Sequence, residues 1–246
     1  MKGLRLLEIA FNSDAQVRGT LFMNRERVES LTRIVPSTIA LTRQFLPDRS
    51  RVETFIEDIY AHSYRSLIAQ HYPTLMNVHD DFGQVIAAIG LRRADEGPLF
   101  LENYLNLPVE RVVEDAVGTP VRREDIVEIG NLASAGKGAS VFLFVTLAAY
   151  LRQQNLAYAV VTATRSLRRS FALFGFDFVE LASADPSVLP DSGASWGSYY
   201  KNDPKVLVGA ILPGFSRLEP YLPLAHNSDL DRLFTRLHPA AGSSLR

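Results

Sequence analysis

The sequence predicts an α/β protein in which a mixed central sheet is flanked by helices on both faces. Between residues 125 and 181, strand-like runs alternate with helix-like runs, a pattern typical of parallel pairing. Earlier, LMNVHD and QVIAAIGLRRA flank a tight Asp81-Phe82-Gly83 turn, which indicates an antiparallel hairpin. With 246 residues, 47% of them hydrophobic, the chain is long enough for one large α/β domain.

The first 50 residues read mainly as strands, because LRLLEIAF is apolar and β-like and IALTRQFLP stops at Pro47. A long amphipathic helix then follows, with apolar residues at helical spacing from Ser50 until Pro73 ends it. We assign residues 1–50 to an N-terminal extension whose role stays open. The main domain is predicted over 51–215, and 216–246 are expected to form a C-terminal helix and a loose tail.

Proline and glycine positions, together with the spacing of apolar residues, predict the later helices and strands. Pro108 opens a short helix that Gly118 and Pro120 close. Apolar runs then predict a strand over 125–133, a helix over 139–154, a strand over 157–163, a helix over 166–174 and a strand over 176–181. KVLVGAIL is expected to be the last strand. This order places at least one parallel strand pair at the centre of the sheet.

Composition excludes several classes of function. A net charge of −1 gives no basic face for nucleic acid, and the arginines at 165, 168 and 169 form only a local cluster. The absence of cysteine excludes disulfides and thiolate chemistry, and the five histidines lack ligand spacing, so no metal is expected. The apolar run 139–151 is too short for a bilayer and no signal peptide is recognised, so we expect a cytoplasmic protein without stable membrane insertion.

The stretch AGKGAS, residues 135–140, joins a predicted strand to an almost wholly apolar helix. Its glycines leave backbone amides at the helix start accessible to an anion, and Lys137 would add a cation. Its spacing matches neither a Walker A loop nor the dinucleotide fingerprint. The alternative interpretation is a tight connection with good capping. The residues predicted to bind a phosphate-bearing ligand are Ala133, Ser134, Gly136, Lys137, Gly138, Ala139 and Ser140.

Together, VEIGNLAS, AGKGAS and VFLFVTLAAYL resemble the fourth strand, pyrophosphate loop and third helix of the GNAT superfamily of N-acyltransferases. Gly138 matches the first loop glycine, whereas Ala135 replaces the usual Arg or Gln and Ser140 the second Gly or Ala. AYAVVTAT is similar to the fifth strand, and Phe174-Gly175-Phe176 to the end of the next helix. The resemblance implies a GNAT-like fold and a thioester donor. The change at Ala135 leaves open whether that donor is acyl-CoA or an acyl carrier protein.

Two further resemblances extend this one. Glu128 followed by Leu132-Ala133-Ser134 is similar to acyl-homoserine-lactone synthases, which share the fold. FLENYL, EIGNLAS and AGKGAS resemble the thermostable hemolysin family over about residues 50 to 212. That family name records an effect on cells and implies no mechanism.

Three residues of the fourth-strand segment are the catalytic candidates. Glu128 is a candidate general base, although strand alternation alone would set it opposite Ile129 and Asn131, toward solvent or an arginine. In GNAT proteins this strand carries a bulge, so the resemblance implies that backbone amides near Leu132 bind the thioester oxygen. Tyr199 and Tyr200 are either acids for the leaving thiolate or packing residues.

Acceptor-site candidates lie on two other segments. The resemblance places the long helix, with Tyr64 and Arg65, along the acceptor pocket. Glu102, Asn103 and Tyr104 form either a wall of that pocket or a cap for the helix after Pro108. The leading hypothesis is therefore an N-acyltransferase with no permanently bound cofactor that joins an acyl group to a small amine. The alternatives are a directly membrane-lytic protein and a catalytically inactive binding module.

Overall fold

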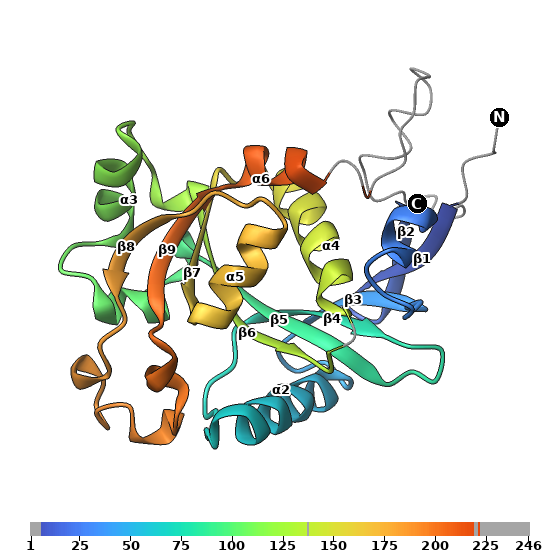
Figure 1. Ribbon diagram of the computed structural model, residues 1–246, viewed down its shortest axis with the longest axis horizontal. Coiled ribbons are helices and arrows are strands. Elements are labelled where there is room, and N and C mark those ends of the chain that lie inside the picture. Colours follow the sequence, from blue (N-terminus) through green and yellow to red (C-terminus); the bar gives the residue numbers. More distant parts are fainter. Residues whose placement is uncertain (1–5, 137, 219–220, 222–246) are drawn as a thin grey trace.

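The computed structural model describes residues 6–136, 138–218 and 221, and they form one nine-stranded sheet with helices on both faces (Figure 1). The strand order is β2-β1-β3-β4-β5-β6-β7-β9-β8. The strands are β1 Leu6–Ser13, β2 Gln16–Asn24, β3 Thr38–Arg43, β4 Thr74–His79, β5 Val85–Arg93, β6 Ile126–Ser134, β7 Tyr158–Ala163, β8 Val179–Ser183 and β9 Lys205–Ala210. The helices are α1 Arg25–Glu29, α2 Arg49–Tyr64, α3 Val109–Val117, α4 Ser140–Gln153, α5 Arg165–Leu173 and α6 Ile211–Leu218.

Pairing in the sheet is mixed, as the sequence predicts. β1 pairs with β3, and β6 with β7, in parallel, while the other neighbours are antiparallel. β4 and β5 form the expected hairpin. The N-terminal strands β1 and β2 join the same sheet at the edge of β3, so the structure places them beside the main body of strands.

Strand alternation separates two cores on the two faces of the sheet. Val127 and Ile129 of β6 pack with α4, whereas Ile126 packs with α3 in a cluster on the opposite face. Similarly, Ile89 of β5 faces α4 and Ala88 faces α2. One face is therefore covered by α4, α5 and α6, which Figure 1 shows side by side, and the other by α2 and α3.

Three predicted boundaries are wrong. The long helix ends at Tyr64 and not at Pro73, because Arg65 adopts the left-handed conformation (φ 56°) and its amide donates to the carbonyl of Ala61 (2.9 Å). The strand predicted over 176–181 runs over Val179–Ser183. The last strand ends at Ala210, and Ile211 opens α6.

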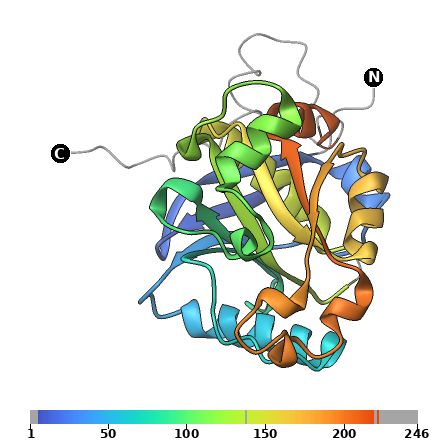
Figure 2. The same cartoon turned by 90° about the vertical axis from the view of Figure 1, so that its left-hand side faces the viewer.

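The loop 184–204 returns from β8 to β9 past the C-terminal end of α2. The amide of Ser198 donates to the carbonyl of Tyr64 (2.8 Å), and that of Leu67 donates to the carbonyl of Ser195 (2.7 Å). Figure 2 shows this loop beside α2 at the bottom of the molecule. These bonds hold Trp196 and Tyr199 of the loop against Tyr60 and Tyr64 of α2.

Two sequence expectations cannot be compared with the fold in full. Most of the predicted tail, residues 219–220 and 222–246, and the loop residue Lys137 lie outside the described residues. In the part of the chain that is described, no helix has both the length and the apolar character needed to cross a membrane.

Candidate active site

A β-bulge interrupts β6 in the middle of the sheet. Ala133 pairs with Ala88 and Gly130 with Gly90, so two residues of β6, Asn131 and Leu132, oppose one residue of β5. Asn131 takes up the extra length in the left-handed region, at φ 48°. The bulge is therefore present in the segment where the family resemblance implies it, and it bends the strand just after Gly130.

Beyond the bulge, β6 and β7 separate. Their parallel ladder pairs only 126–129 with 158–161. Past Val161, the carbonyl of Thr162 accepts a hydrogen bond from the hydroxyl of Tyr199 (3.2 Å) in the loop 184–204. The β7-facing edge of β6 over 130–134 thus has no ladder partner in β7, and main-chain groups of the bulge can reach a molecule placed in the gap.

A cavity of about 1270 Å³ is lined by both strands at this gap and by residues from both faces of the sheet. On the α4 side its aromatic lining is phenylalanine, and we call this part the phenylalanine half. On the α2 side it carries tyrosines and one tryptophan, and we call this part the tyrosine half. The phenylalanine half is lined by Phe144, Phe171, Phe176, Phe178 and Phe215, and the tyrosine half by Tyr60, Tyr64, Tyr72, Phe100, Tyr104, Trp196 and Tyr199.

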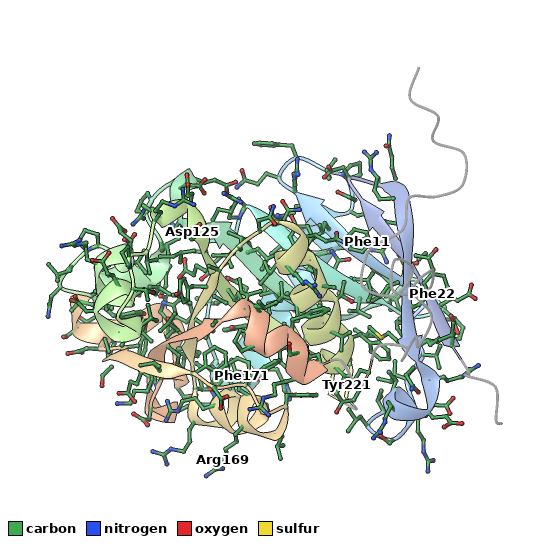
Figure 3. The ribbon with its side chains drawn as sticks, turned by 90° about the horizontal axis from the view of Figure 1, so that it is seen from above. Phe11, Phe22, Asp125, Arg169, Phe171 and Tyr221 are labelled. Atoms are coloured by element: carbon green, nitrogen blue, oxygen red, sulfur yellow. The ribbon has the colours of Figure 1, made fainter. Side chains whose placement is uncertain are left out.

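Helix α5 shows how the lining is oriented. Figure 3 shows Phe171 pointing inward and Arg169 pointing away from the molecule. Phe171 is 7% exposed, and its ring lies 4.7 Å from that of Phe178 and 5.8 Å from that of Phe144. The phenylalanine half therefore offers a ligand aromatic walls with few polar groups.

Tyr72 forms the floor of the tyrosine half over two paired glycines. Gly90 and Gly130 are cross-strand partners, and the Tyr72 ring lies so close to both that a Cβ on either would collide with it. A Cβ at position 90 would lie 2.7 Å from the ring. The backbone of Tyr72 is held by Arg49, whose guanidinium donates to the Tyr72 carbonyl (2.5 Å). Because Gly90 and Gly130 have no side chains, the Tyr72 ring can pack directly against the backbone of β5 and β6.

Glu128 lies beneath Tyr72 and is 1% exposed. Its carboxylate accepts the amides of Phe100 and Leu101, both at 2.9 Å, and also interacts with the Tyr72 hydroxyl through a side-chain hydrogen bond. Burial raises the pKa of Glu128, although the two amides and the Tyr72 hydroxyl oppose the shift. Glu128 itself does not line the cavity, whereas Tyr72 does. Tyr72 is therefore the group through which Glu128 can act on a ligand.

Arg92 completes this cluster. It is the cross-strand partner of Glu128, and its guanidinium carbon lies 5.6 Å from the centre of the Tyr72 ring. Burial raises the pKa of Tyr72 well above its usual value, the nearby Glu128 charge raises it further, and Arg92 acts in the opposite direction. At neutral pH Tyr72 is accordingly a neutral phenol, whose hydroxyl donates a hydrogen bond to Glu128 and whose oxygen can accept one from a ligand.

The FLENYL segment forms a short 3-10 helix, Phe100–Tyr104, that caps α3 and lines the cavity. The Glu102 carboxylate accepts the amide of Val109 at the start of α3 (3.1 Å) and pairs with Arg123 at 2.7 Å. Burial would raise the pKa of Glu102, but Arg123 and the bound amides outweigh it and lower the pKa to about 2. Tyr104 shares a 2.6 Å hydrogen bond with Tyr200. Glu102 thus caps α3 while also forming part of the cavity wall.

Three amides in the described part of the AGKGAS loop, those of Ala135, Gly136 and Ala139, are bonded within the protein. The amides of Ala135, Ala139 and Val141 donate to backbone carbonyls, and that of Gly136 donates to the hydroxyl of Ser134. Gly138, at φ 82°, lies directly against the segment of Leu31 and Thr32 that precedes β3. Its glycine is needed for that close approach as well as for the backbone conformation.

The cavity gathers about half of the predicted site residues. Lining it are Asn131, Leu132, Ser134, Ser140, Tyr64, Glu102, Asn103 and Tyr104. Away from the lining lie Glu128, Arg65, Gly136 and Gly138, together with Ala133 and Ala139, which are buried in the core. Arg65 is exposed and its observed role is to end α2. The catalytic and binding roles of these residues stay predictions.

Sequence analysis missed Tyr72 and Arg92. A signal was available for Tyr72, since IAAIGLRR and VEIGN each carry a single glycine inside a predicted strand, which marks a close approach of another group. Only the register of β5 against β6 reveals that the two glycines are neighbours. Within the described residues, no cluster of His, Asp and Glu side chains is arranged to hold a metal ion.

Solved structures share this fold at low sequence identity. The AHL synthase LasI matches with a TM-score of 0.52 and 15% identity, over 77% of this chain and 98% of that one. BjaI, a CoA-dependent acyl-homoserine lactone synthase solved with SAM and isopentyl-CoA, matches with a TM-score of 0.51 and 13% identity, over 74% and 87%. An acetyltransferase of the GNAT family from Staphylococcus aureus Mu50 matches with a TM-score of 0.41 and 10% identity, over 70% and 99%.

The likeness to the two synthases confirms the predicted GNAT-like fold and nothing finer. A comparison with curated proteins finds no match. The family model of the thermostable hemolysins matches residues 43–215, which include β4 to β9 and the whole AGKGAS loop. The match covers most of the chain and agrees with the resemblance seen in FLENYL and EIGNLAS. The chain belongs to the thermostable hemolysin family.

Proposed function

We propose that this protein is an N-acyltransferase that moves an acyl group from a thioester donor, either acyl-CoA or an acyl carrier protein, to a small amine. The observation that carries the proposal is the gap between β6 and β7 after the bulge at Asn131, which opens on a cavity lined from both faces of the sheet. In the proposal, the thioester lies in the gap, the acyl chain in the phenylalanine half and the amine in the tyrosine half.

The reaction is a direct transfer. The amine nitrogen attacks the thioester carbon, a C–N bond forms, the C–S bond breaks and the amine proton ends on the leaving thiolate. Main-chain amides near Leu132, on the edge of β6 that β7 leaves unpaired, would bind the oxyanion of the tetrahedral intermediate. A chain without cysteine is suited to this route, since no acyl-enzyme is needed.

Two tyrosines would move the protons. The Tyr72 hydroxyl can accept the proton of the attacking amine and pass its own to Glu128, which burial already biases toward the protonated form. Tyr199, whose hydroxyl lies at the gap on the carbonyl of Thr162, is held neutral because burial raises its pKa well above the usual value. It can therefore donate a proton to the leaving thiolate, after which solvent returns a proton to Tyr199 and takes up the one held by Glu128, so that the net proton transfer is from the amine to the thiol.

The test uses purified protein with acyl-CoA donors of 4 to 16 carbons, the same acyl groups on a carrier protein, and a pool of small amines. Mass spectrometry should detect a new amide, with an equal amount of free thiol. Tyr72→Phe keeps the ring over Gly90 and Gly130 but removes the hydroxyl, and should lower the rate about 100-fold or more. Tyr158→Phe, on β7 outside the cavity lining, should not. Absence of any amide with every donor would refute the proposal.

A further inference from the structure

Most charged side chains that line the cavity are bonded to other groups of the protein. Arg217 pairs with Asp177 at 3.4 Å, and Glu102 pairs with Arg123. Asp191 accepts the amides of Gly193 and Ser195, and His71 binds Glu57 at 2.9 Å. Of the three basic side chains in the described lining, His71 and Arg217 each have a carboxylate partner, whereas no carboxylate lies within ion-pair distance of the Arg92 guanidinium.

The position of Arg92 explains why it has no ion-pair partner. Glu128 is its cross-strand neighbour, but Glu128 is already bound by the amides of Phe100 and Leu101 and by Tyr72. The Arg92 guanidinium lies over the Tyr72 ring instead, and Nη1 donates to the carbonyl of Pro98 (3.1 Å). Of its five N–H donors, one has a protein acceptor in the described structure. The remaining edge is available to a planar anion.

We propose that Arg92 binds a carboxylate on the acceptor, so that the acceptor class is amino acids and other amines with a carboxylate close to the nitrogen. This inference rests on the proposed acyltransferase function. A guanidinium favours a carboxylate because two parallel N–H donors match its two oxygens.

The arrangement fits the two ends of such an acceptor. Tyr72 lies over the Gly90–Gly130 pair, and Arg92 and Glu128 form a cross-strand pair two residues along on the same face of the sheet, the side of the tyrosine half. With its carboxylate on Arg92, an amino acid would place its nitrogen toward the Tyr72 hydroxyl. The reaction would then be RCO–SR′ + H₂N–CHR″–COO⁻ → RCO–NH–CHR″–COO⁻ + R′SH. The product is an anionic amphiphile, a class of molecule that can itself disrupt membranes.

The experiment compares matched acceptors with one donor series. Purified protein is given decanoyl-CoA or palmitoyl-CoA, or the same acyl groups on a carrier protein, with each amino acid and with its decarboxylated amine, for example leucine against isoamylamine. We expect kcat/KM to be about 10- to 100-fold higher for the amino acid, the range of one charge-assisted pair. In Arg92→Gln this ratio should fall to about one, mainly through KM. Arg93→Gln, whose partner is the exposed Asp95, should keep the wild-type ratio.

The outcomes separate the two proposals. Acylation of decarboxylated amines as fast as of amino acids, or an unchanged ratio in Arg92→Gln, would overturn the assignment of Arg92 while leaving acyl transfer intact. No amide with either panel would count against the acyltransferase itself. Arg92→Lys, which keeps the charge but loses the planar fork, should retain part of the preference if the assignment is right.

Discussion

The two halves of the cavity are both aromatic, yet they differ in chemistry. In the phenylalanine half, Phe144 and Phe171 pack edge to face and carry no polar atoms. In the tyrosine half, hydroxyls find partners within the protein, as in the Tyr104–Tyr200 bond and the bond from Tyr199 to Thr162. The comparison teaches that the sheet separates an apolar compartment from one whose aromatic side chains carry hydroxyl groups. The gap after the bulge in β6 joins the two compartments, so a single ligand can occupy both.

The largest effect on stability and activity is expected from adding a side chain at Gly130, beneath the Tyr72 ring. In Gly130→Ala the new Cβ would collide with the Tyr72 hydroxyl, so the ring must move away from Glu128. We expect a loss of about 1–3 kcal/mol in the free energy of unfolding and of about 100-fold in kcat/KM. Chemical denaturation and the amide assay measure both. Removing the ring as well, in Tyr72→Ala/Gly130→Ala, should make the alanine at 130 nearly neutral for stability, and a full additive cost would contradict the packing described.

The second effect is a pH-dependent contribution to stability from Glu102, in the cavity wall. The pKa of Glu102 is about 2 in the folded protein and 4.5 unperturbed, so its contribution to stability is fully present above about 4.5 and is lost as the pH falls through 2. Glu102→Gln should therefore lower the free energy of unfolding by about 2 kcal/mol at pH 7. The difference from wild type should shrink between pH 5 and pH 2. Glu124→Gln, in the exposed pair with Arg122, should change stability by less than about 0.5 kcal/mol.

The phenylalanine half can be shortened without touching the tyrosine half. Ala148 of α4 lines the cavity and is half-buried, so Ala148→Phe should reduce kcat/KM for 16-carbon donors about 10-fold relative to shorter ones. Ala172→Phe on the exposed side of α5 is the matched control. A uniform loss across all donor lengths would mean that the acyl chain lies elsewhere.

The smallest effect is expected at the Tyr104–Tyr200 bond. Tyr104→Phe and Tyr200→Phe each remove the same 2.6 Å hydrogen bond, so each should cost about 1 kcal/mol of stability. The double variant should cost little more than either single one, which urea denaturation can resolve. Strictly additive costs would show that the two hydroxyls act independently.

Local periodicity is enough to predict most of the fold. From Val85 to Ala163, apolar residues recur about every two residues in the strands and every 3.6 residues in the helices, and Pro108 and Gly118 mark the start and end of one helix. The predicted bounds of these elements agree with the structure within a few residues. The end of α2 is not predictable in this way because Arg65, a residue with no preference for the left-handed region, adopts it there. Its conformation coincides with bonds to the distant loop 184–204, which no local pattern reports.

The site is less predictable than the fold, for a physical reason. Tyr72 is positioned by glycines 18 and 58 residues away along the chain, and the register that aligns them depends on a bulge that sequence does not show. Glu102 is predicted either to cap a helix or to form a wall of the acceptor pocket; the structure shows the cap and places the residue in the cavity lining, and its role toward an acceptor stays a prediction. Contacts that depend on strand register and loop packing lie beyond local sequence patterns.

The N-terminal strands have a consequence for handling the protein. The family match begins at residue 43, the last residue of β3, so a chain shortened to the matched segment would lose β1, β2 and nearly all of β3. β4, with the buried Leu75, Met76 and Val78, would then become an edge strand. An uncovered apolar edge is a template for self-association, so we expect the shortened chain to aggregate more readily than the full chain, which light scattering can measure.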